Sequence, residues 1–146
     1  MATYGATIAS NGNLYKPRFM SYATEVNSQE VVVTNAKKIK SKLPEKNAAY
    51  LDRVKQGFSA CASSGYCGDP MQPFAGKVSA KTGTAEVGDW TTANLVGYAP
   101  SDDATMAFAC SAPTSSINDQ SVSPNICSNM VMPEFIQKYF ELYPAS

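Results

Sequence analysis

The chain has 146 residues, 44% of them hydrophobic and 10% aromatic, which suits one compact domain or a large part of one and argues against disorder. Its 12 basic and 12 acidic residues balance, so it has neither a basic field for nucleic acid nor an acidic tail. Histidine is absent, which excludes histidine-dependent triads and histidine-ligated metals, and we expect neither a metal nor a cofactor.

The first predicted element is a helix over residues 1–10. Small residues form one side of it, and three larger side chains are predicted to anchor it at helical spacing: Met1, Tyr4 and Ile8. Asn11-Gly12 supplies the left-handed backbone that ends a helix. No capping residue precedes this helix, so we expect Met1 to be an internal position of a longer chain.

The next segments alternate between extended and helical patterns. Residues 14–33 are predicted to be β-rich, with Pro17 marking an edge strand or a strand entry, and the polar residues 34–46 are predicted to be a connector. Residues 47–61 form an amphipathic helix. Its predicted core-facing side chains are Tyr50, Leu51, Val54, Phe58 and Cys61.

The second half of the chain begins with a loop over residues 62–73. Three strands are then predicted at residues 76–87, 93–99 and 105–111. The turn at residues 100–103 makes the last two strands an antiparallel pair.

Residues 112–128 are predicted to be irregular, and the chain ends in a helix over residues 129–143 with Pro133 in its first turn. Its predicted buried face consists of Phe135, Ile136, Tyr139, Phe140 and Tyr143. The order of elements indicates an α/β (α+β) fold class with an antiparallel sheet flanked by helices.

Two of the four cysteines, Cys61 and Cys67, are separated by a short flexible loop. A disulfide between them would stabilise the fold by about 2 kcal/mol on the chain-entropy estimate. It requires an oxidising, extracytoplasmic setting, and the alternative is two free, inert thiols.

The stretch Lys81-Thr82-Gly83-Thr84 carries the candidate chemistry on the first of the three strands. Because side chains alternate along a strand, Thr82 and Thr84 share one face, and Lys81 and Gly83 share the other. Two hydroxyls can hydrogen-bond a carboxylate, a glycine admits a close approach, and a lysine adds a positive field for an anion. The pattern therefore predicts one wall of a site for an anionic substrate.

Several segments, in order along the chain, resemble the end of a class B penicillin-binding protein transpeptidase domain. They are residues 4–13 followed by Lys16-Pro17, the helix at 54–58, the strand at 78–86, residues 93–100, residues 106–109 and the terminal helix. The resemblance spans nearly the whole chain. It implies that residues 1–146 form the C-terminal half of a β-lactamase/transpeptidase-like fold, a single and incomplete domain.

The resemblance further implies a peptidoglycan D,D-transpeptidase that works through a serine acyl-enzyme. The family's nucleophilic serine belongs to a Ser-x-x-Lys motif, and this chain contains none, so we expect the chain alone to be inactive. The family's Ser-x-Asn motif is matched by letters only, at residues 116–118 and 123–125, and we interpret both as chance matches.

The implied roles fall on the Lys-Thr-Gly stretch. Lys81 would supply positive potential, Thr82 and Thr84 would bind the carboxylate of a stem peptide or a β-lactam, and the Thr84 N–H would form half of an oxyanion hole. Gly83 would let the ligand approach. Trp90 would line the acceptor side of the cleft, although packing alone is the plainer role for a single tryptophan.

The family resemblance also sets expectations for location and partners. We expect the extracytoplasmic face of the bacterial membrane, with the anchor outside this chain, because the opening residues lack a signal-peptide pattern. The expected partners are the stem peptide or β-lactam and the N-terminal half of the transpeptidase domain, with self-association through the surface left uncovered.

Three other functions stay open at this stage. They are a non-catalytic β-lactam sensor or envelope scaffold of the same fold, a serine β-lactamase or carboxypeptidase of the same superfamily, and a globular domain with an accidental Lys-Thr-Gly.

Overall fold

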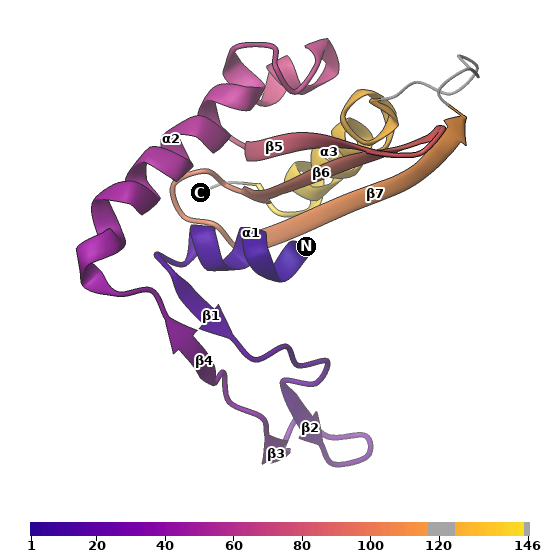
Figure 1. Ribbon diagram of the computed structural model, residues 1–146. Coiled ribbons are helices and arrows are strands. Elements are labelled where there is room, and N and C mark those ends of the chain that lie inside the picture. The colour runs from indigo at the N-terminus through magenta and orange to yellow at the C-terminus, as the bar shows by residue number, and fades with distance from the viewer. Residues whose placement is uncertain (117–124, 145–146) are drawn as a thin grey trace.

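A three-stranded antiparallel sheet forms the centre of the computed structural model, which describes residues 1–116 and 125–144 (Figure 1). Its strands, in spatial order, are β5 (Ser79–Val87), β6 (Trp90–Ala99) and β7 (Met106–Ser116). The predicted antiparallel pairing is confirmed. Residues 112–116 were expected to be irregular, and this expectation is wrong: pairing with β6 extends β7 through them, because a ladder of hydrogen bonds overrides their turn-like composition.

Helices cover both faces of this sheet (Figure 1). The front face carries α1 (Ala2–Ala9) and α2 (Ala48–Ser63), and the rear face carries the π-helical segment η3 (Cys127–Val131) and α3 (Met132–Leu142). Alternation along β6 separates two cores: Val96 packs with Ile8 and Phe58 at the front, whereas Leu95 packs with Ile136 at the rear. The α+β class with helices flanking an antiparallel sheet is therefore confirmed.

The helix α1 lies very close to the sheet because Gly5, at the crossing, has no side chain. A methyl group on Gly5 would lie 2.7 Å from the carbonyl oxygen of Gly97. The helix then ends as predicted, with Asn11 at φ 56° and Gly12 at φ 83°.

The buried faces of the helices are narrower than the apolar stripes suggested. In α2, Phe58 and Cys61 are buried, but Tyr50 is 70% exposed and Val54 is 41% exposed. The same correction applies to four predicted anchor or core side chains on the other two helices, which are exposed: Met1, Tyr4, Phe135 and Tyr143. A helix crossing a sheet of three strands buries only the side chains over the strands, and the rest of its stripe stays open.

The residues between α1 and α2 form an arm that projects from the body (Figure 1). It contains the antiparallel pairs β1 (Asn13–Tyr15) with β4 (Ile39–Lys42), and β2 (Tyr22–Thr24) with β3 (Val31–Thr34). The expectation of a plain connector over residues 34–46 is wrong because β4 pairs with β1, although its lysines gave no apolar alternation to indicate a strand. Pro17 lies between strands and not within one.

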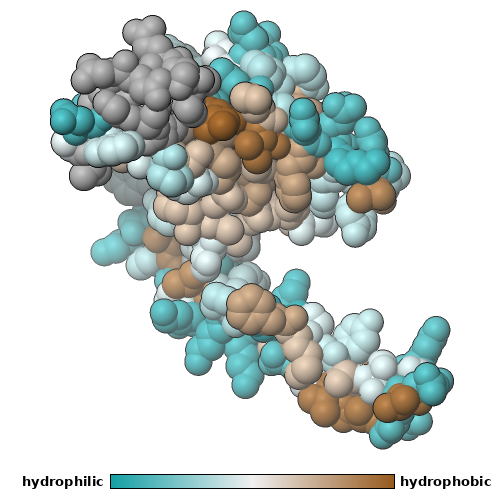
Figure 2. All heavy atoms as spheres, turned by 90° about the vertical axis from the view of Figure 1, so that its right-hand side faces the viewer, coloured by the Kyte–Doolittle hydropathy of each residue, from teal (hydrophilic) through white to brown (hydrophobic). Residues whose placement is uncertain are grey.

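The arm carries apolar side chains on its surface. Figure 2 shows them gathered at the end of the arm, apart from the body. The exposed ones include Phe19, Met20, Tyr22, Val26, Val31, Val32 and Val33. A two-stranded ribbon is marginally stable by itself in water, so this surface needs a cover.

Two short 3-10 segments complete the described chain, η1 (Glu45–Asn47) before α2 and η2 (Asp69–Phe74) within the predicted loop over 62–73. Within residues 1–116 and 125–144, no helix has the length and apolar character needed to cross a membrane.

All four cysteines are paired. Of the two alternatives for Cys61 and Cys67, the structure has the disulfide, with Cα atoms 5.1 Å apart. A second disulfide joins Cys110 of β7 to Cys127 of η3, with Cα atoms 5.7 Å apart. This second disulfide was not predicted, because Cys110 and Cys127 lie 17 positions apart and spacing does not determine connectivity.

Candidate active site

The Lys-Thr-Gly stretch lies on an open edge of the sheet. In the described part of the chain, β5 is bonded to β6 on one side and to no strand on the other. Lys81, Gly83 and Thr84 are exposed, and Thr82 is half-buried. An edge strand presents unpaired backbone N–H and C=O groups to any ligand that lies alongside it. The stretch therefore faces solvent, as a ligand-binding wall must.

The strand register assigns each side chain of the stretch to a face. Lys81 is opposite Val96, so Lys81 and Gly83 lie on the front face with α1 and α2. Thr82 is opposite Leu95, so Thr82 and Thr84 lie on the rear face with η3. A ligand beside the edge of β5 can reach the cation and the hydroxyls together, because both faces meet there.

The Lys81 ammonium is oriented by the backbone of its own strand. Its Nζ donates a hydrogen bond to the Thr82 carbonyl oxygen at 2.8 Å. A carbonyl partner leaves the positive charge unneutralised, so the ammonium can still attract an anion. The ion pair that the described residues do form lies elsewhere, on α3, where Lys138 Nζ is 2.9 Å from Glu141 Oε2. There the hydrogen bond and the opposite charge raise the pKa of Lys138 and lower the pKa of Glu141.

Two polar residues that the sequence analysis missed extend the front face of the wall. Asn94 is opposite both Gly83 and Ser111, so the three residues form one row across the sheet. The Ser111 hydroxyl donates to Asn94 Oδ1 at 2.8 Å, and Asn94 Nδ2 donates to the Thr92 carbonyl at 3.0 Å. Strand parity alone could not have found them, because the register between the strands decides which residues of β6 and β7 share a face with Lys81.

Gly83 keeps this row open and unobstructed. A methyl group placed on it would meet no atom closer than the Asn94 Cβ, at 3.9 Å. The fold itself therefore does not require glycine here, and the missing side chain leaves room for a ligand.

Trp90 is on the same hairpin but away from the other candidates. It is the first residue of β6, is paired with Val87, and is 59% exposed. It lies three positions before Ala93, the partner of Thr84, which corresponds to about 10 Å along the strand. The structure thus brings Lys81, Thr82, Gly83 and Thr84 together and leaves Trp90 at the far end of the hairpin.

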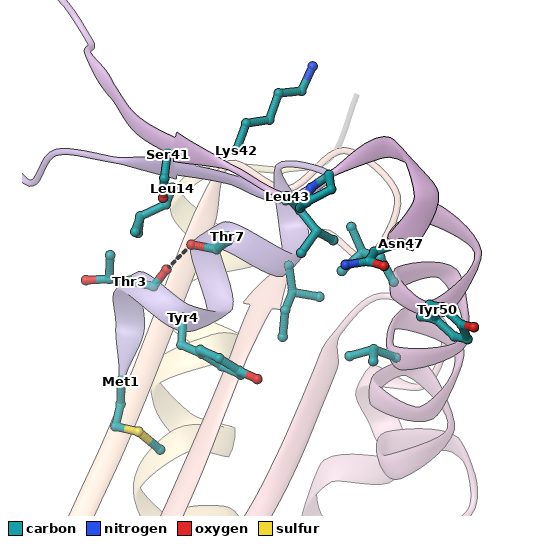
Figure 3. Close-up of a pocket in the computed structure, with 15 residues that line it drawn as sticks. Met1, Thr3, Tyr4, Thr7, Leu14, Ser41, Lys42, Leu43, Asn47 and Tyr50 are labelled. Atoms are coloured by element: carbon teal, nitrogen blue, oxygen red, sulfur yellow. Dashed lines mark hydrogen bonds between the residues drawn. The ribbon is translucent and has the colours of Figure 1, made fainter.

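A large groove is lined by residues outside the Lys-Thr-Gly stretch (Figure 3). It has a volume of about 910 Å³ and lies between α1, the β1–β4 ribbon and α2. Its lining is mostly apolar, includes the exposed Tyr4, Tyr50 and Val54, and has Lys42 as its charged residue. None of the lining residues belongs to the Lys-Thr-Gly stretch, whose ammonium and hydroxyls can bind an anion, so we assign the chemistry to β5 and not to this groove.

The two Ser-x-Asn matches found in the sequence lie only partly within the described residues. The two Ser-x-Asn matches include residues 117–118 and 123–124, which lie outside the described residues. Across the described ranges, no cluster of three or more histidine, cysteine, aspartate or glutamate side chains is arranged to hold a metal.

Two solved structures show which fold class the chain belongs to. The chain superposes with a TM-score of 0.67 on the D,D-transpeptidase domain of a peptidoglycan glycosyltransferase from Eggerthella lenta, at 20% identity, covering 98% of this chain and 31% of that one. It superposes with a TM-score of 0.75 on penicillin-binding protein 2B from Streptococcus pneumoniae (strain R6), at 27% identity, covering 99% of this chain and 25% of that one.

The family follows from sequence. Residues 1–132 match the model of the penicillin binding protein transpeptidase domain, and the chain belongs to this family. It is 27% identical over 157 aligned positions to penicillin-binding protein 2A of Bacillus subtilis (strain 168), covering 97% of this chain and 22% of that protein. The resemblance to a class B penicillin-binding protein is confirmed. The chain spans between about a fifth and a third of the length of these relatives.

Proposed function

We propose that residues 1–146 are the C-terminal part of a peptidoglycan D,D-transpeptidase domain and supply the Lys-Thr-Gly wall of its serine acyl-transfer site. The supporting observation is an exposed edge strand bearing Lys81, Thr82 and Thr84 in a chain of this family. The chain contains no Ser-x-x-Lys, so the nucleophile comes from polypeptide outside these residues, and the chain alone is inactive.

Each residue of the wall has a role in this proposal. The Lys81 ammonium attracts the carboxylate of a stem peptide or a β-lactam, and the Thr82 and Thr84 hydroxyls donate hydrogen bonds to it. The open face beside Gly83 admits the substrate, and Trp90 contacts the acceptor strand. The backbone N–H of Thr84 donates to the developing oxyanion, a contribution of about 3–4 kcal/mol to transition-state stabilisation.

The proposed location is the extracytoplasmic face of the bacterial membrane, with the anchor outside this chain. The supporting observation is that every cysteine is in a disulfide: Cys61 with Cys67, and Cys110 with Cys127. Disulfides form and persist in oxidising compartments and are rare in the cytosol.

The alternative function is a non-catalytic β-lactam sensor or envelope scaffold of the same fold. The absence of Ser-x-x-Lys from this chain favours it. If the coding sequence upstream of residue 1 also lacks this motif, the scaffold explains the protein better than the transpeptidase does.

Labelling with a fluorescent penicillin tests the proposal. The purified chain is incubated with the reagent, denatured and separated on a gel. We expect no covalent adduct, since the nucleophile is missing. A stable adduct mapped by mass spectrometry to a serine of this chain would overturn the proposal.

A further inference from the structure

The Cys110–Cys127 disulfide lies on the same face of the sheet as the Thr82 side chain. Cys110 on β7 is opposite Leu95 on β6, and Leu95 is opposite Thr82 on β5. Directly paired residues of an antiparallel sheet project to the same face, so Cys110, Leu95 and Thr82 form one row on the rear face. The next row contains Thr84, Ala93 and Ala112. The disulfide is thus two strands away from the hydroxyls of the wall.

The other half of this disulfide is held in the rear core. Cys127 is fully buried, and its Sγ lies 3.5 Å from the carbonyl oxygen of Ala93, in the row of Thr84. Leu95, with no exposed surface, packs in the same cluster as Cys127 and is the direct neighbour of Thr82. The bond therefore fixes the element that supports both hydroxyl-bearing rows from behind.

The supporting element η3 begins at this disulfide and continues directly into α3, whose Met132 and Ile136 pack in the rear core. η3 is a single π-helical segment of five residues, and its first residue is Cys127. It fits against the loop after Cys67, where a methyl group on Gly68 would lie 2.3 Å from Asn129 Oδ1. Gly68 thus leaves the space that the Asn129 side chain occupies, and η3 is seated between this loop and the sheet, so a displacement of η3 changes its contacts with the sheet.

The Cys61–Cys67 disulfide provides a natural comparison within the same chain. It joins the last turns of α2 to the loop that follows, with a separation of six residues, and attaches nothing to the sheet. Both bonds contribute to the same rear core, but only Cys110 belongs to a strand.

We propose that the Cys110–Cys127 disulfide is a positioning element for the Lys-Thr-Gly wall: by holding η3 against the rear of β6 and β7, it keeps Thr82 and Thr84 in their rows. Its reduction loosens the wall. This inference rests on the proposed function, because it concerns the geometry of the proposed site. Its test depends on the fold alone.

Amide hydrogen exchange of the 146-residue chain, read by NMR, tests the inference. The variant Cys110→Ala/Cys127→Ala is compared with the matched control Cys61→Ala/Cys67→Ala. We expect amides of residues 81–84 to exchange at least tenfold faster in the first variant than in the control, and their resonances to shift, while amides of α1 keep their rates. Equal rates at 81–84 in the two variants, or acceleration spread evenly over α1, α2 and the sheet, would overturn the inference.

A second measurement covers the case in which the first variant does not fold. In the Cys61→Ala/Cys67→Ala background, Cys110–Cys127 is the sole disulfide, and a water-soluble phosphine reduces it. The disulfide takes up two electrons and two protons to become two thiols, while the phosphine takes an oxygen atom from water and becomes a phosphine oxide. Loss or shift of the 81–84 resonances before those of α1 supports the inference, and simultaneous loss of both refutes it. Neither measurement uses penicillin labelling, so a failure of the proposed acyl transfer would not change the outcome of this test.

Discussion

The closest approach between α1 and the sheet can be tested by adding a methyl group at Gly5. In Gly5→Ala, the new Cβ would lie 2.7 Å from the Gly97 carbonyl oxygen and 3.4 Å from a Val96 methyl group. The first contact is with backbone, which cannot rotate away. Overpacking of this kind costs about 1–3 kcal/mol, and the upper half of that range applies because α1 must move as a unit. Replacing glycine inside a helix also gains about 1 kcal/mol of propensity, which offsets part of the loss.

The matched control is Gly57→Ala in α2, where a methyl group would meet no atom within 4 Å. The propensity gain is common to both variants, so the difference between them isolates the clash. Urea unfolding should place Gly5→Ala about 2–3 kcal/mol below Gly57→Ala in free energy of unfolding. Equal stabilities would refute the packing of α1 on β6.

The remaining predictions concern the wall, the disulfides and the arm. When the chain is joined to polypeptide that supplies Ser-x-x-Lys, the substitution Lys81→Met should lower the rate of penicillin acylation about 100-fold or more. The control substitution Lys77→Met, at an exposed lysine, should leave this rate unchanged. Equal effects of the two substitutions in stopped-flow labelling would contradict the assignment. Loss of the Cys110–Cys127 disulfide should lower the free energy of unfolding by about 3 kcal/mol, and loss of Cys61–Cys67 should lower it by about 2 kcal/mol, because the sequence separations are 17 and 6. The reversed order in urea unfolding would show that strain or residual structure, and not loop length, sets the two contributions. Residues 13–46 contain seven basic and three acidic residues, and the rest of the chain contains five basic and nine acidic residues. Because salt screens the attraction between these opposite charges, we expect self-association of the chain to weaken in high salt. A monomer at every concentration in sedimentation experiments would count against this prediction.

The fold was predictable where one pattern controls one element. The 3.6-residue periodicity predicted α1 and α2, and the short turn at 100–103 predicted the β6–β7 pair. Prediction failed where the structure of a segment depends on residues that are far away in the sequence. The strand β4 exists because β1 is beside it, and Tyr50 is exposed because the sheet under α2 does not extend to it.

The faces on which the candidate residues lie were predictable from the sequence, but the place of their strand in the sheet was not. Parity along the strand placed Lys81 and Thr82 on opposite faces, as observed. Whether the strand is central or at an edge depends on the order of strands in space, which local sequence does not encode. The row containing Asn94 and Ser111 was missed for the same reason, since it exists only once β5, β6 and β7 are in register.

The position of the wall at an edge has a chemical consequence. In a central strand, the cation of Lys81 and the hydroxyls of Thr82 and Thr84 would be separated by the sheet, and no single carboxylate could meet both. At an edge, a ligand lying along β5 meets its free backbone groups first and can then be reached from the front by the ammonium and from the rear by the hydroxyls. The rear side is also the side on which Cys110 and Cys127 are joined, so in the inference drawn above the geometry of the hydroxyls depends on η3, whereas the Lys81 ammonium, on the front, is hydrogen-bonded to a carbonyl of β5. Loosening η3 should therefore weaken hydrogen bonding to the carboxylate while leaving the electrostatic attraction to it intact.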